Sequence, residues 1–196
     1  MTNTTRGTTR GIAREAVRAE LAQVAFGLFR REGFDKVTLD DLASAAGVSR
    51  STFLRYFRTK EDAVLGAFDA QGEELAAVLR DRPEAEDDWT ALRRAMDHVL
   101  DPYRRDPEHS LALTALVRET SSLCARRLEK QDGWRAGLAR SLAARSGDPG
   151  PGTLAQTVRA AAALDCLNVA LDHWTASDGR SDLDALLDEA FAVLAA

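Results

Sequence analysis

The chain has 196 residues, of which 45% are hydrophobic and 29% are charged, as in an ordinary folded protein and unlike a disordered one. This length predicts one or two domains, and no apolar run approaches the roughly 18 residues that a membrane span requires. Residues 1–60 hold 11 Lys or Arg and 6 Asp or Glu, whereas the remainder holds 15 and 25, so the net charge of −5 divides into +5 and −10. This asymmetry gives nucleic acid one preferred end to approach; chance clustering is the alternative.

The N-terminal residues are rich in threonine and arginine and lack the apolar segment of a secretory signal. We therefore expect a cytoplasmic protein. Residues 1–12 are interpreted as a flexible basic arm. In this interpretation Arg6, Arg10 and Arg14 add contacts to phosphates or to the minor groove.

Two short helical patterns follow, joined by a turn at Gly47. Thr38 can cap the first helix, and Asp41 can reach back to the amide of Thr38, which is a capping-box arrangement. Gly47 stands where this helix must stop and where the backbone often needs a positive φ angle. Ser49 can cap the second helix. The pattern predicts two helices with a sharp turn between them.

The second of these helices has one apolar face and one polar face. Phe53 and Phe57 lie four residues apart, so they share a face that we expect to be buried. The opposite face carries Ser51, Thr52, Arg55 and Arg58, with Arg50 and Tyr56 on its flanks. A guanidinium can bind two acceptors of guanine, and hydroxyls can meet base edges or phosphates, so this face suits a major groove. An amphipathic helix pair in an unrelated bundle, with its arginines merely solvated, is the alternative.

Residues 18–65 resemble the DNA-binding domain of the tetracycline-repressor (TetR) family. The resemblance is carried by the apolar residues of a first helix, the stop at Gly33-Phe34, the turn, and the run from Tyr56 to Asp62. The apolar residues are Leu21, Val24, Ala25, Leu28 and Phe29. The resemblance implies base contacts from Arg50, Ser51 and Arg55, and phosphate contacts from Thr38, Thr52, Tyr56 and Lys60. Many members have tyrosine where this chain has Leu54, which would meet a thymine methyl group or pack.

Beyond residue 60 the chain is expected to contain only helices and loops. Apolar residues recur at helical spacing over 61–82, 89–103, 108–120, 122–146, 153–176 and 182–195. Pro102 and Pro107 are expected to break this pattern, and the GDPGPG run at 147–152 is expected to be a loop. We predict an all-α protein of about nine helices. Its three-helix DNA-binding domain would span 13–60, and a helical regulatory and dimerisation domain would span 61–196.

The helices at 153–176 and 182–195 are apolar over broad faces and therefore need burial on several sides. We predict that they pair with their copies in a second chain to form an isologous four-helix interface. Closure of the monomer's own core is the alternative. The family resemblance implies a homodimer on a palindromic operator in double-stranded DNA, released by a small-molecule effector bound within the helical body.

Candidate effector contacts are the polar residues Thr120, Asp165 and Asn168, which interrupt apolar helix sequence, together with Trp134. A solvated polar stripe is the alternative. Cys124 and Cys166 lack metal-ligand spacing and are expected to be core residues. No paired histidine motif, phosphate loop or nucleophile elbow appears, so we expect no metal, no cofactor and no enzyme activity. The sequence predicts a ligand-responsive DNA-binding repressor; an all-helical adaptor or an enzyme without DNA binding is the alternative.

Overall fold

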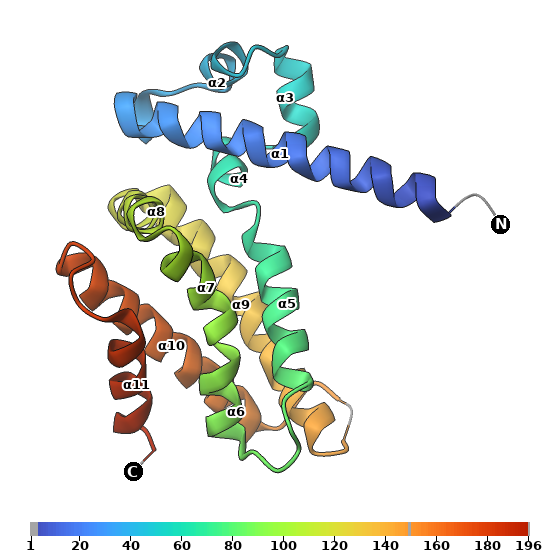
Figure 1. The fold of residues 1–196 in the computed structure, drawn as a ribbon, viewed down its shortest axis with the longest axis vertical. Helices are drawn as coiled ribbons and strands as arrows, with labels where there is room; N and C mark the ends of the chain where they lie inside the picture. Colours follow the sequence, from blue (N-terminus) through green and yellow to red (C-terminus); the bar gives the residue numbers. More distant parts are fainter. Residues whose placement is uncertain (1–3, 149, 196) are drawn as a thin grey trace. The chain divides into compact units, whose positions relative to one another are not determined.

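The computed structural model describes residues 4–148 and 150–195, with side chains from residue 11 onward. Within these ranges all secondary structure is helical, which confirms the predicted all-α class (Figure 1). The chain divides into two compact units at Gly66 and Ala67. The first unit contains α1 (Thr4–Glu32), the 3-10 helix η1 (Phe34–Lys36), α2 (Leu39–Ala45), α3 (Arg50–Tyr56) and α4 (Lys60–Leu65). The second contains α5 (Phe68–Arg80), α6 (Asp88–Ala95), α7 (Asp97–Arg105), α8 (Pro107–Glu119), α9 (Ser121–Arg145), α10 (Leu154–Ala176) and α11 (Leu183–Val193).

In the first unit, η1, α2 and α4 contact α1, and α3 contacts α2. Leu21, Ala25 and Phe29 recur every four residues on α1 and are buried. The ring of Phe34 lies 4.7 Å from that of Phe29, measured between centroids. This packing becomes possible because Gly33 ends α1 with a φ of +88°, which turns the chain back. The result is a small aromatic core beneath the two short helices.

The N-terminal segment differs from its expected form. Residues 4–12 continue α1 instead of forming a flexible arm, and no proline interrupts the helix there. Residues 1–3 and the side chains of Arg6 and Arg10 lie outside the described part of the chain. The contribution of this segment to DNA binding stays a prediction.

The helix expected at 61–82 occurs as two helices, α4 and α5, separated at Gly66-Ala67. The carbonyl of Gly66 accepts a hydrogen bond from Nη2 of Arg18 at 2.9 Å, which ties the end of α4 to α1. The boundary between the units therefore falls after Gly66 rather than after residue 60, because α4 packs with the first unit.

The helix expected at 89–103 is also divided, because α6 ends at Ala95 and α7 begins at Asp97. Pro102 does not break the helical pattern, since it lies inside α7. Pro107 is the first residue of α8, a position that lacks an intrahelical N–H partner in any case. The side chain of Asp106 caps α8 by accepting from the amide of His109 at 3.1 Å.

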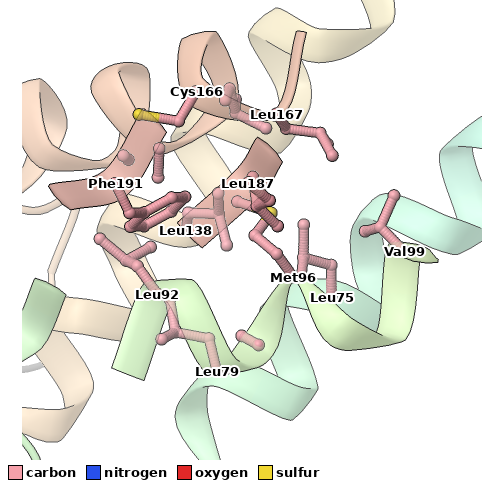
Figure 2. Packing of buried hydrophobic residues seen from close by; sticks show 14 of the residues in the cluster. Leu75, Leu79, Leu92, Met96, Val99, Leu138, Cys166, Leu167, Leu187 and Phe191 are labelled. Carbon is pink, nitrogen blue, oxygen red and sulfur yellow. The ribbon is translucent and has the colours of Figure 1, made fainter. Parts of the chain in front are cut away.

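The core of the second unit lies where α5, α6 and α7 meet α9, α10 and α11. Figure 2 shows side chains of these helices converging, among them Leu79, Leu92, Leu138 and Phe191. Cys166 is buried in this core, as expected for a small apolar residue. Among the described residues, no helix is both long enough and apolar enough to cross a membrane.

Candidate nucleic-acid interface

Two capped helices and a tight turn build the candidate interface. The Thr38 hydroxyl accepts from the amide of Asp41 at 3.2 Å, and the Asp41 carboxylate accepts from the Thr38 amide at 2.9 Å, which completes the capping box. Hydrogen bonds from the Thr38 hydroxyl and then its amide lower the pKa of Asp41 below its ordinary value. Gly47 has a φ of +66°, as its position predicted. Ser49 caps α3 by accepting from the amide of Thr52 at 3.1 Å.

Phe53 and Phe57 anchor α3 to the first unit. Both side chains are almost completely buried, and their ring centroids lie 5.4 Å apart. The other side of α3 is open, because Arg50, Ser51 and Arg55 are exposed. The three residues expected to contact bases are therefore exposed on the side of α3 opposite its buried phenylalanines.

The remaining polar residues of α3 lie at the margin of this surface. Thr52 and Tyr56 are half-buried, and the Thr52 Oγ1 accepts from the Ser49 hydroxyl at 2.9 Å. Leu54 is 36% exposed, so its methyl groups are accessible beside the polar residues. The sites expected to contact phosphate thus border those expected to contact bases.

Two arginines, Arg50 and Arg14, make contacts at this surface. Nη1 of Arg50 lies 2.8 Å from Oδ2 of Asp40, and both side chains are largely exposed. A base or phosphate must compete with this pair, which in water contributes only about 0 to 1 kcal/mol. Arg14 reaches α3 from α1, because its guanidinium carbon lies 5.8 Å from the centroid of the Tyr56 ring. Sequence reasoning had assigned Arg14 to the arm and missed this contact.

Lys60 has a structural role that the sequence pattern did not reveal. Its Nζ donates to the carbonyls of Phe34 at 2.8 Å and Val37 at 3.3 Å. The same ammonium lies 4.4 Å from the centroid of the Phe34 ring. These contacts tie the start of α4 to the segment that leads into α2. Contact of Lys60 with a DNA phosphate stays a prediction.

Replacing Lys60 with alanine should therefore destabilise the first unit, by about 1 to 3 kcal/mol, because charge-assisted hydrogen bonds to partly buried carbonyls are lost. Lys36→Ala is the matched control, since Lys36 is an exposed lysine at the end of η1. Thermal unfolding checks the effect. Equal melting temperatures for the two variants would mean that the carbonyl contacts of Lys60 contribute nothing to the fold.

Comparisons with known proteins agree with this geometry. The pattern of the family described as bacterial regulatory proteins, tetR family, matches residues 21–65, and the MftR C-terminal domain pattern matches 86–196. The regulator MftR of Mycobacterium tuberculosis is 30% identical over 184 residues, covering 90% of this chain and 88% of that protein. The chain belongs to the TetR family. The HTH-type transcriptional regulator TcmR of Streptomyces glaucescens is 32% identical over 136 residues, which cover 66% of this chain but only 60% of TcmR.

Solved structures show the TetR fold along most of the chain. FadR of Bacillus subtilis, solved with stearoyl-CoA, has a TM-score of 0.61 and 17% identity, over 90% of this chain and 96% of that one. FadR of Thermus thermophilus, solved with lauroyl-CoA, has a TM-score of 0.57 and 22% identity, over 90% and 92%. This chain is therefore a TetR-family regulator with a helix-turn-helix domain followed by a helical domain.

The four candidate effector residues have different surroundings in the second unit. Trp134 is buried, and its Nε1 donates to the Phe68 carbonyl at 2.9 Å. Asp165 is exposed on α10, and Thr120 directly precedes α9. Asn168 lies in a half-buried cluster of polar side chains. No hydrogen bond joins any two of the four, and the described residues contain no group of three or more His, Cys, Asp or Glu that could hold a metal.

Asn168 bonds instead to two residues of α9 that sequence reasoning missed. Its Oδ1 accepts from Nη1 of Arg127 at 2.7 Å and from Nε2 of Gln131 at 3.0 Å. Arg127 and Gln131 are four positions apart and therefore share one side of α9. This spacing was the signal that could have found them.

Proposed function

We propose that this protein is a transcriptional repressor that binds a palindromic DNA operator as a homodimer and is released by a small molecule bound in its second unit. The exposed side of α3 carries the proposal, because Arg50, Ser51 and Arg55 stand opposite the buried Phe53 and Phe57. Family membership and the net charge of +5 over residues 1–60 support it. The protein would act in the cytoplasm.

The residues divide into two roles toward DNA. Arg50, Ser51 and Arg55 would contact base edges, where a guanidinium suits guanine. The half-buried Thr52 and Tyr56, with Thr38 and Lys60, would contact phosphates and fix the register of the protein on the duplex. Leu54 would meet a thymine methyl group, since its side chain is 36% exposed.

Exposed apolar side chains on the last two helices support the homodimer. Leu154, Val158 and Val169 of α10 are 82%, 57% and 50% exposed. Positions 4 and 15 residues apart return to nearly the same side of an α-helix, so the three share a face. Val193 and Leu194, at the end of α11, are 70% and 54% exposed. A second copy would cover both helices and place two reading helices on successive half-sites.

Release by an effector requires a coupling between the two units. A coupling of typically 1 to 3 kcal/mol lowers DNA affinity by about 5- to 150-fold, which is enough to free a promoter. The two FadR proteins with this fold were solved with stearoyl-CoA and lauroyl-CoA. Compounds with a long acyl chain are therefore the first to test as effectors.

Selection of bound sequences from a random duplex pool tests the proposal directly. We expect a palindrome whose half-sites are separated by about 34 to 36 Å, or a multiple of that distance. If the recovered sequences share no motif and no gel shift occurs at low salt, the DNA-binding role is excluded.

Replacing Arg55 with alanine should reduce affinity for the selected operator by about 1 to 3 kcal/mol and relax the preference at one base position. Arg31→Ala is the control, because Arg31 is an exposed arginine in the last turn of α1. Fluorescence anisotropy with the operator, its single-base variants and random DNA checks the result. An equal loss on operator and random DNA would contradict base reading by Arg55.

A further inference from the structure

A polar cluster bridges α9 and α10 inside the second unit. Nη1 of Arg127 donates to Oε1 of Gln131 at 3.0 Å as well as to Asn168. Nδ2 of Asn168 donates back to Oε1 of Gln131 at 3.2 Å. Gln131 is buried, and the other two side chains are half-buried. Both hydrogen bonds of the guanidinium come from Nη1, so Nε and Nη2 still have donors for another acceptor.

The charge of Arg127 has only neutral partners. Within the described residues its guanidinium bonds to two amide oxygens and to no carboxylate. Two nearby cations of α9 have a carboxylate partner, since Lys130 pairs with Asp69 at 2.5 Å and Arg135 with Asp132 at 3.0 Å. Arg145, at the end of the same helix, donates to the backbone carbonyls of Arg82, Pro83 and Glu86. Arg127 is half-buried, so its charge is only partly hydrated, and the cost of that partial burial is lowered by a partner of opposite charge. The free donors of Arg127 are therefore suited to an anionic group.

Tyr103, whose pKa responds to the charge of Arg127, belongs to a group of aromatic and apolar side chains on the core of the second unit. The ring of Tyr103 packs edge-on against Trp174, with 5.5 Å between centroids. Burial raises the pKa of Tyr103 above its ordinary value, while a hydrogen bond with Thr114 and the positive charge of Arg127 act in the opposite direction. The half-buried Tyr103 is therefore within electrostatic reach of the guanidinium. Leu111 and Leu171 pack on the same core.

We propose that Arg127 binds the carboxylate of an acid with an apolar tail, and that this acid is the effector of the repressor proposed above. A guanidinium and a carboxylate form two parallel hydrogen bonds, which Nε and Nη2 can supply while Nη1 keeps its amide partners. The tail would lie against the aromatic and aliphatic side chains around Tyr103. This inference rests on the proposed function for the consequence of binding, but not for binding itself.

Calorimetric titration of the full chain without DNA tests the proposal. Laurate is the probe, and 1-dodecanol is the matched neutral compound. We expect laurate to bind the native chain, and we expect the Arg127→Gln substitution to lower the affinity for laurate by about 10-fold or more. Arg127→Lys keeps the charge and should recover part of the loss. Arg135→Gln, which removes an arginine already paired with Asp132, should bind laurate as the native chain does.

Several results would overturn the proposal. These are no laurate binding to the native chain, equal binding of laurate and 1-dodecanol, or equal laurate binding by the native chain and a folded Arg127→Gln variant. Lauroyl-CoA separates the sources of negative charge, because its thioester replaces the carboxylate while its phosphates remain anionic. Tighter binding of lauroyl-CoA than of laurate would therefore also exclude the carboxylate.

The titration is independent of the repressor function. A chain that binds laurate through Arg127 but shifts no DNA would refute the repressor and leave the acid site in place. A chain that binds a selected operator but fails the laurate criteria would refute only the acid site. Loss of operator binding on addition of laurate, absent in Arg127→Gln, would join the two.

Discussion

Replacing Val158 with glutamate should yield a folded monomer whose affinity for the operator is at least about 100-fold lower than that of the native protein. Val158 is 57% exposed on the apolar face of α10, so the glutamate would be solvated in the monomer. In an isologous interface each copy would bring one carboxylate, and burial of these unpaired charges is unfavourable. Each monomer would then hold a single half-site.

Sedimentation equilibrium and operator titration measure the two parts of this prediction. Leu128→Glu is the control, because Leu128 is an exposed leucine of α9, outside the proposed interface, with 51% of its surface accessible. A Val158→Glu protein that still sediments as a dimer would refute the interface. A monomer that binds the operator as tightly as the native chain would refute the need for dimerisation.

Replacing Gly72 with alanine should lower the free energy of unfolding by about 1 to 3 kcal/mol, the usual cost of overpacking a core. A Cβ atom at Gly72 would lie 2.2 Å from Cδ1 and 2.3 Å from Nε1 of Trp134. The indole would have to move, and it would lose both its hydrogen bond to Phe68 and its stacked contact with the Phe68 ring. Denaturant unfolding and tryptophan fluorescence measure these effects.

The sign of the Gly72 effect is diagnostic, because glycine to alanine inside an open helix normally stabilises by up to about 1 kcal/mol. Gly133→Ala provides that reference. Gly133 lies within α9, and an added Cβ there would meet nothing within 4 Å. If both alanine variants are more stable than the native chain, the packing of Trp134 does not require a glycine at position 72.

The helix-turn-helix could be predicted from sequence because its signals are local. The caps at Thr38 and Ser49, the positive φ of Gly47 and the pair Phe53 and Phe57 each depend on residues within about one turn. The long helices α9 and α10 were also found within a few residues, since apolar spacing persists over many turns.

Features set by distant contacts could not be predicted in this way. Met96 is a good helix former and has helical φ and ψ angles, yet α6 ends at Ala95 and α7 begins at Asp97, so local propensity gives no sign of this break. The ammonium of Lys60 finds its carbonyl partners more than 20 residues away, and Arg127 meets Asn168 from another helix. Such partners become neighbours only after folding, so their spacing along the sequence does not predict the contact.

The contacts between α9 and the first turn of α5 have a consequence for how sensitivity to an effector could evolve. Trp134 and Lys130 hold Phe68 and Asp69, which follow directly after the residues that join the two units. Arg127 stands seven positions before Trp134, about 10 Å along the same rigid rod. In the proposed repressor, a displacement of α9 would therefore act on the first turn of α5, which begins two residues after Gly66. Substitutions between Arg127 and Lys130 would then change the effector concentration at which the proposed repressor leaves DNA, while the residues expected to contact bases stay the same.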